Sequence, residues 1–265
     1  MPVQWEGLRV SAIVLHPLLL LFCVGFVLFI STFVGYRLAL ITGINEDAYR
    51  HEHIVVLREG LFVLLALLLG FMVAMVLPRF DQRRDLELEE AHSISATWLQ
   101  ARALPEPQRQ RSLQLLREYL AVRCRFSGST LANQTALNAN TEQTKVLQEQ
   151  LWHQFLEVEK QNQTVVTGTY ERTLSEMIGV PEKRLAAFEN RVPAAVWIII
   201  LVVAAFQSFI TGYSMKRKIW LSLTVTPIVI AIVISLIADL DDPHSGLIRV
   251  EQNSMNRLAS ELTEH

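Results

Sequence analysis

The three aspartates that follow the last apolar segment are the side chains best suited, by type and spacing, to bind an ion. Asp239, Asp241 and Asp242 open the run that ends at Gly246. Carboxylate oxygens are the ligands that hard cations such as calcium prefer, so these aspartates are candidate metal ligands. The Asp-Pro and Ser-Gly steps of the same run are turn chemistry. The alternative is therefore that the run only ends the preceding helix.

The other polar clusters favour solvated surface over chemistry. His51 and His53 are two residues apart, which turns their imidazoles away from each other on a helix, whereas the metalloprotease zinc motif needs a spacing of four. A run of acidic residues is interleaved with arginines, a pattern that favours exposed ion pairs between neighbouring helical turns. Its members are Arg79, Asp81, Arg83, Arg84, Asp85, Glu87, Glu89 and Glu90.

Motifs of catalysis and of cofactor binding do not occur in the sequence. It contains no glycine-rich phosphate loop before a helix, no nucleophile elbow and no zinc-type cysteine pair. Two cysteines, Cys23 and Cys124, are too few for a disulfide scaffold. A net charge of -2 without a basic aromatic patch argues against nucleic-acid binding. We therefore expect no enzyme, no cofactor and no nucleic-acid partner.

Four long segments without formal charge indicate membrane spans rather than a soluble globular domain. They contain 27, 19, 24 and 20 residues and lie between Arg9 and Arg37, Glu59 and Arg79, Arg191 and Lys216, and Lys218 and Asp239. About 20 apolar residues are needed to cross a bilayer core as a helix. The sequence therefore predicts an all-α membrane protein with spans at about 13–35, 60–77, 193–213 and 219–238.

The polar segment between the second and third spans is predicted to be helical. Leu113, Leu116 and Leu120 repeat at intervals of three and four, which marks one apolar helix face. Residues 127–144, rich in Ser, Thr, Asn and Gln, are predicted to form a loop or the weakest part of the insert. Pro181 is predicted to interrupt the last helix. The segment carries 15 basic and 15 acidic residues, so its net charge favours neither cations nor anions.

These elements divide the chain into four parts. Residues 1–78 hold an N-terminal segment and two spans, 79–191 a helical soluble insert, 192–238 two further spans, and 239–265 a C-terminal tail. Because the number of spans is even, both termini are expected on the same side of the membrane as the insert. Lysine and arginine near the membrane are in slight excess on that side, which favours the cytoplasm.

The second span carries two stripes of residues at helical spacing. A small-residue seam, which lets helix backbones approach closely, consists of Ala66, Gly70 and Ala74. A bulky apolar ridge, about 100° away around the helix, consists of Val63, Leu67 and Phe71. One interpretation is a lipid-facing ridge beside a packing seam. The other is a ring in which the seam joins subunits and the ridge forms a hydrophobic neck that gates by dewetting.

The residues that end this span resemble those of the bestrophins. Leu69-Gly70-Phe71 is followed, eight residues after the phenylalanine, by Arg79-Phe80, as in the second membrane helix of that family. The order of spans, insert and tail is also similar. A bacterial membrane family of unassigned function, described as bestrophin-like, matches more closely from the second span onward. Its pattern is seen in Arg79-Phe80-Asp81-x-Arg83-Arg84, Arg117-Glu118-Tyr119, Arg191-Val192-Pro193 and Asp239-Leu240-Asp241-x-Pro243-x-Ser245-Gly246-Leu247-Ile248-Arg249-Val250.

Bestrophins are pentameric ion channels whose neck is lined by apolar residues of the second span. The resemblance implies that the ridge forms the neck and the seam contacts the next subunit, in a bacterial inner membrane. Calcium-sensing bestrophins carry an acidic clasp after the fourth span, where this chain has its shorter aspartate run. We expect membrane lipid, further copies of the chain and small inorganic ions as partners. The alternative is a non-conducting membrane scaffold or regulator whose insert binds a soluble partner.

Overall fold

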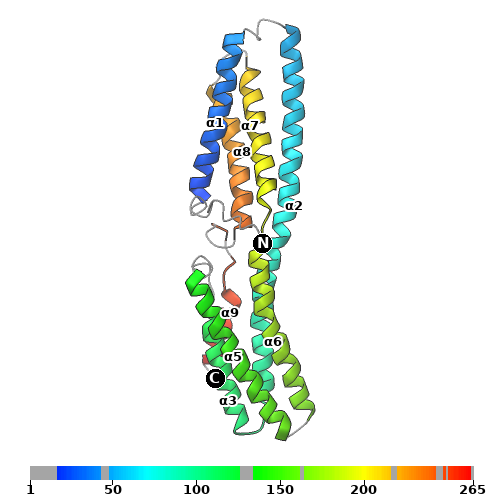
Figure 1. Ribbon diagram of the computed structural model, residues 1–265, viewed down its shortest axis with the longest axis vertical. Coiled ribbons are helices and arrows are strands. Elements are labelled where there is room, and N and C mark those ends of the chain that lie inside the picture. The colour runs from blue at the N-terminus through cyan, green and yellow to red at the C-terminus, as the bar shows by residue number, and fades with distance from the viewer. Residues whose placement is uncertain are drawn as a thin grey trace, which may run out of the picture. The chain divides into compact units, whose positions relative to one another are not determined.

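The chain forms only α-helices as regular elements in the ranges that the structure, a computed structural model, describes (Figure 1). These ranges are 17–42, 48–125, 134–161, 164–215, 220–242, 247–248 and 250–263. Four of the helical segments described are long and apolar enough to cross a membrane. The predicted all-α membrane fold, with four spans and a helical insert, is confirmed. The chain divides into two compact units, residues 1–78 with 191–248 and residues 79–190 with 249–265.

The first of these, the membrane unit, contains α1 (Pro17–Thr42), the part of α2 (Ala48–Ala101) up to Pro78, α7 (Ala194–Tyr213) and α8 (Trp220–Asp241). Helix α1 packs against α7 and α8, as Figure 1 shows. The buried core of the unit consists of Leu28, Leu65, Met72, Val76, Val192, Ile200, Ala204, Ile230, Ala231, Ile234 and Ile237. With no water in the bilayer, each span satisfies its backbone hydrogen bonds internally.

Helix α1 extends further than the first predicted span. The sequence predicts its end near Gly35, whereas α1 continues to Thr42 and includes the charged Arg37. The guanidinium of Arg37 lies 5.6 Å from the centre of the Phe33 ring. A long arginine stem can keep the charge near the membrane surface while the helix continues, so the charge does not end the helix. The predicted residues 13–16 lie outside the described ranges.

Two glycines bring α1 and α7 into backbone contact. A Cβ built on Gly35 would lie 2.1 Å from the carbonyl oxygen of Phe209, and one built on Gly212 would lie 1.9 Å from the carbonyl oxygen of Thr32. Each glycine therefore leaves room for the backbone of the other helix. Small residues that permit such close approach are a common way to pack membrane helices, where lipid weakens the hydrophobic drive to associate.

The second unit, the insert unit, contains the part of α2 from Arg79, α3 (Gln108–Cys124), α5 (Gln134–Gln161), α6 (Val165–Glu189) and the short α9 (Asn253–Thr263). In it, α3 packs against α5 and α9, and α6 packs against α5. Its core is centred on Ile94, Trp98, Leu116, Tyr119, Leu151, Phe155, Tyr170, Leu174, Met177 and Met255.

Two sequence predictions about the insert are wrong. Residues 134–144 belong to helix α5 rather than to a loop, because their polar side chains bond within the helical unit, and the predicted residues 127–133 lie outside the described ranges. The Nδ2 of Asn140, for example, donates to the carbonyl oxygen of Val122 at 3.0 Å. Helix α6 also continues through Pro181 to Glu189. A single proline removes one backbone bond, which packing on both sides of it can outweigh.

The glycine contact predicts that Gly212→Ala destabilises the membrane unit. The new methyl group would overlap a backbone carbonyl, and overpacking of this kind costs about 1–3 kcal/mol. The matched control is Gly25→Ala on α1, whose added Cβ would lie at an ordinary 3.6 Å from the Cβ of Ala231. We expect a lower melting temperature in detergent for the first variant only. Equal melting temperatures would show that α1 and α7 are not in backbone contact.

Candidate functional site

The ridge and the seam lie on a side of α2 that the described part of the subunit does not cover. The side chains of Val63, Leu67 and Phe71 are 66%, 53% and 60% exposed, respectively. Ala66, Gly70 and Ala74 are exposed as well, and a Cβ built on Gly70 would meet no atom within 4 Å. Both stripes are therefore available to something outside the subunit, which is either lipid or another copy of the chain.

The opposite side of the same helix holds α2 in the membrane unit. Leu65, Met72 and Val76 are almost completely buried, and they pack in one cluster with residues of α1, α7 and α8. In the N-terminal part of α2, the Nη1 of Arg58 donates to Oγ of Ser214, the residue after α7, at 3.3 Å. Helix α2 is thus fixed along one side, and that side determines which way the ridge and the seam face.

The three aspartates after the fourth span have backbone amides and one arginine as partners. Asp239 accepts hydrogen bonds from the amides of Leu247 at 2.8 Å and Ile248 at 2.9 Å. Both carboxylate oxygens of Asp241 lie 3.3 Å from the amide nitrogen of Val192, just before α7. Asp242 forms an ion pair with Arg191 at 3.5 Å. The carboxylates therefore tie the end of α8 to the start of α7 and to the segment that follows.

This arrangement supports the interpretation that the aspartate run ends the helix. The run also connects the end of α8 to the start of α7 and to the segment that follows. Among the residues described, no group of three histidine, cysteine or acidic side chains is arranged to hold a metal ion. Asp239 and Asp241 are also largely buried, with their oxygens directed at backbone amides. Metal binding by Asp239, Asp241 and Asp242 stays a prediction that the geometry does not support.

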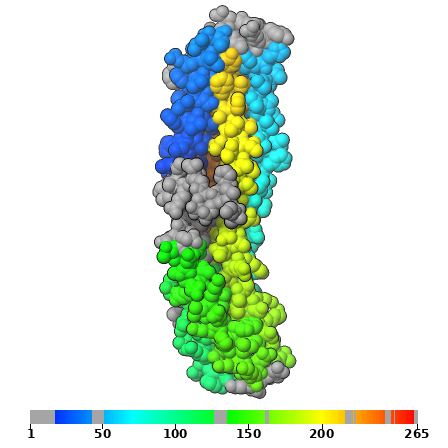
Figure 2. Space-filling view, in the orientation of Figure 1, coloured from blue at the N-terminus to red at the C-terminus, as the bar shows by residue number. Residues whose placement is uncertain are grey.

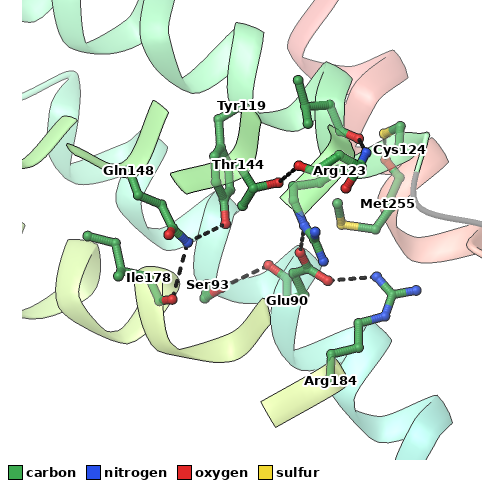
Figure 3. Close-up of polar contacts among 12 residues, drawn as sticks. Glu90, Ser93, Tyr119, Arg123, Cys124, Thr144, Gln148, Ile178, Arg184 and Met255 are labelled. Atoms are coloured by element: carbon green, nitrogen blue, oxygen red, sulfur yellow. Dashed lines mark hydrogen bonds and ion pairs between the residues drawn. The ribbon is translucent and has the colours of Figure 1, made fainter. Parts of the chain in front are cut away.

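In the insert unit, a buried carboxylate joins three helices. Glu90 of α2 is fully buried and lies between Arg123 of α3 and Arg184 of α6, two residues that are each 2% exposed (Figure 3). The Nε of Arg123 donates to one carboxylate oxygen, and the Nη1 of Arg184 donates to the other at 2.6 Å. Burial by itself would raise the pKa of Glu90. The two guanidiniums outweigh that effect and hold the pKa below its usual value.

A second polar contact lies beside this triad. The Nε2 of Gln148 on α5 reaches both the hydroxyl of Tyr119, at 3.5 Å, and the carbonyl oxygen of Ile178, at 3.2 Å (Figure 3). Burial, helped by the nearby charge of Glu90, raises the pKa of Tyr119 far above its usual range, so the phenol stays neutral. The bonds of Glu90 and Gln148 together connect α2, α3, α5 and α6.

Glu87, one turn before Glu90, holds the last helix of the chain. Its Oε1 accepts hydrogen bonds from the amides of Ser254 at 3.0 Å and Met255 at 3.1 Å, in the first turn of α9. A carboxylate at a helix N-terminus satisfies amides that have no partner inside the helix and also interacts favourably with the helix dipole. Met255, Leu258 and Leu262 are buried in the same core.

The prediction that the acidic run forms exposed ion pairs is therefore wrong for the members of the run that are buried. Glu89 does pair on the surface, with Lys183 at 3.0 Å, but Arg83, Glu87 and Glu90 are buried. These positions follow the spacing of four and three that continues to Ile94 and Trp98, so they share the packed face of α2. The sequence contained that spacing, but charged residues on it favoured a solvated interpretation. The partner arginines lie 33 and 94 residues away.

A family model for the Bestrophin-like domain matches residues 22–255 of the sequence. The chain belongs to this family. The match includes the first span from Phe22 onward, the other three spans and nearly all of the insert unit, and it agrees with the resemblance seen in the sequence. Among curated proteins, no sequence matches this bestrophin-like chain.

Solved structures show the same fold. A bacterial bestrophin homologue from Klebsiella pneumoniae, solved by zinc anomalous phasing, has a TM-score of 0.64 and 18% identity, covering 89% of this chain and 97% of its own. A variant of the Klebsiella homologue has a TM-score of 0.64 and 16% identity, covering 89% and 98%. A crystal structure of a membrane protein has a TM-score of 0.67 and 15% identity, covering 93% and 96%. The bestrophin-like chain thus has a bestrophin-type fold and is an integral membrane protein.

The triad predicts how the stability of the insert depends on pH. Because the folded state lowers the pKa of Glu90, its contribution to stability is complete above the unfolded pKa of about 4.3 and is lost as pH falls through the lower folded value. At neutral pH, Glu90→Gln leaves two buried guanidiniums without their counter-charge and should cost about 3–5 kcal/mol. The variant should also lose less unfolding free energy than the wild type as the pH falls, because its residue 90 no longer titrates.

The measurement is unfolding of the purified protein between pH 7 and pH 3, followed by tryptophan fluorescence, since Trp98 lies in the same core. Glu89→Gln is the control, because it removes only an exposed pair with Lys183, which is worth less than about 1 kcal/mol. Equal destabilisation by the two variants would show that Glu90 is not the buried junction of the unit.

Proposed function

We propose that this bestrophin-like chain is the subunit of a homo-oligomeric, pentameric ion channel with an apolar neck on α2. The observation that carries the proposal is the two-sided character of this helix. Leu65, Met72 and Val76 are buried against the subunit, while the seam and the ridge are both left uncovered. The bestrophin-type fold supports the same conclusion.

The seam favours a second copy of the chain over lipid as its neighbour. Lipid contact requires only apolar surface, and bulky side chains provide that as well as small ones. Ala66, Gly70 and Ala74 instead leave a shallow groove along α2, of the kind that lets another helix approach closely. A single four-helix subunit is too small to enclose a pore, so repeated heterologous contacts through this groove must close into a ring.

The ridge then has the dimensions of a hydrophobic gate. From Val63 to Phe71 the helix rises about 12 Å, and in the ring each copy contributes the same three apolar side chains to that length. None of them can replace the hydration shell of an ion. Such a constriction conducts only when it is wide enough to stay wet, which makes it a gate rather than a binding site.

The other parts of the chain take supporting roles in this proposal. The insert forms a vestibule on the cytoplasmic side of a bacterial inner membrane, together with both termini. The partners are membrane lipid, further copies of the chain and small inorganic ions. The aspartate run connects the end of the fourth span to Val192 and Leu247 through hydrogen bonds from their backbone amides. The ring symmetry can be determined by electron microscopy of the purified protein in lipid.

Widening the neck should increase ion leak. Leu67→Ala combined with Phe71→Ala removes two bulky side chains from the ridge, so the constriction should stay hydrated in a larger fraction of channels. We expect at least about tenfold more current in planar bilayers, which corresponds to lowering a barrier by about 1.4 kcal/mol. The control, Leu57→Ala with Phe62→Ala, removes the same side-chain types from exposed positions on α2 outside the ridge.

Current that rises equally in both double variants would place the ridge in lipid. If wild type and variants are all silent over a range of ions and voltages while folded and oligomeric, the non-conducting scaffold is the better function.

Filling the seam should weaken the assembly without unfolding the subunit. Neither Gly70 nor Gly60 has an atom within 4 Å of a built Cβ, so a side chain added at either position starts in open space on the isolated subunit. In the ring, Gly70→Leu would separate neighbouring α2 helices, whereas Gly60→Leu lies off the seam. We expect a smaller particle mass for Gly70→Leu alone, by native mass spectrometry in detergent. An unchanged particle mass would show that the seam does not form the subunit contact.

A further inference from the structure

One face of α6 in the insert unit is acidic and otherwise lined by small residues. Its positions are spaced by three and four residues: Gly168, Glu171, Ser175, Gly179, Glu182, Ala186 and Glu189. All are exposed except Gly179, which is half-buried, and no atom lies within 4 Å of a Cβ built on either glycine. Figure 2 shows the surface of α6, in yellow-green, open along the unit.

The carboxylates of this face have no ion-pair partner in the part of the chain that the structure describes. The basic side chains of α6 form ion pairs with other carboxylates: Arg172 with Glu176, Lys183 with Glu89 and Arg184 with Glu90. Glu171, Glu182 and Glu189 therefore present a negative, sterically open strip along α6.

The surface formed by α3 and the turn before it has the opposite charge. Arg102, Arg111, Arg117 and Arg125 are exposed there. The acidic residues of the same surface are Glu106, which bonds Arg109, and Glu118, which accepts from Gln114 at 3.0 Å. Among the described residues, no carboxylate forms an ion pair with Arg102 or Arg111. In the unit, α3 and α6 each pack on α5 and not on each other, so the two charged faces belong to different flanks.

The opposite charges lie at matching heights along the unit. Gln148 of α5 bonds both Tyr119 on α3 and Ile178 on α6, so these two residues are at one level. Bonds of α5 to Val122, and its ring contact from Phe155 to Tyr170, show that α3 and α6 both run antiparallel to α5. They are therefore parallel to each other.

From that level, Arg111 and Glu171 lie about 12 and 10 Å in one direction along their helices, and Arg125 and Glu182 lie about 9 and 6 Å in the other. Rotation about an axis parallel to the helices leaves each residue at its own height. Copies related by a ring axis can therefore bring each arginine opposite a carboxylate.

We infer that neighbouring copies meet in the insert unit by a heterologous contact, with Glu171 and Glu182 on α6 of one copy facing Arg111 and Arg125 on α3 of the next. The inference rests on the ring assembly proposed above and adds the surfaces that join it. A twofold pairing of α6 with α6 would oppose like charges, which costs free energy and suppresses that mode. Contacts between two different faces, repeated around an axis, are the kind that closes a ring.

The test is a charge swap in the purified full chain, with particle mass measured by dilution in detergent at low and high salt. Glu171→Lys with Glu182→Lys should raise the concentration at which the oligomer dissociates by about tenfold or more at low salt, since charges that face each other in an interface become like charges. Arg111→Glu with Arg125→Glu should do the same. Combining all four substitutions restores opposite charges and should bring the dissociation concentration back towards that of the wild type.

The control pair, Glu142→Lys with Glu149→Lys, reverses two exposed charges on α5 and should leave the mass unchanged. The inference is overturned if each charge-swap pair keeps the wild-type dissociation concentration, if the α5 pair weakens the oligomer equally, or if the fourfold variant is weaker than either pair. A wild-type monomer would instead overturn the ring itself. A conducting wild-type oligomer that is insensitive to the swaps overturns only this contact.

Discussion

Within the described ranges, helix α2 is packed by its own chain on one side, and the rest of the structure depends on this constraint. In the membrane unit that side is formed by Leu65, Met72 and Val76, and in the insert unit by Glu90 and Ile94. Lipid tails are as apolar as leucine, so hydrophobicity alone does not select what covers the other side. In the proposed ring the selection comes from shape, because small residues beside bulky ones make a groove that suits a helix better than a lipid tail.

Buried charge is used for joining helices rather than for chemistry. Glu90 connects α2 to α3 and α6 through Arg123 and Arg184, and Glu87 holds the start of α9. A buried ion pair adds little net stability over an apolar contact, but losing one partner is costly, so such groups favour one arrangement of helices over its alternatives. The aspartates after α8 act in the same way, since their oxygens accept from backbone amides at the end of the span.

The two units differ in what brings their helices together. In the membrane unit, α1 and α7 meet backbone to backbone beside Gly35 and Gly212, because the bilayer offers little hydrophobic gain for further burial. In the insert unit, an apolar core that includes Trp98, Tyr119 and Phe155 excludes water, and hydrogen bonds through Glu90 and Gln148 determine how the helices align.

The sequence by itself determined the four spans, the helical insert and the bestrophin resemblance, because an uncharged stretch long enough to cross a bilayer is a property of consecutive residues. It also showed the two stripes of α2, since helical periodicity is local. Only the tertiary structure decided that Glu87 and Glu90 are buried, that residues 134–144 are helical and that Gly35 and Gly212 bring the backbones of α1 and α7 together. The physical reason is that the free energy of a charged or small side chain depends on its partners, and here these come from helices distant in sequence.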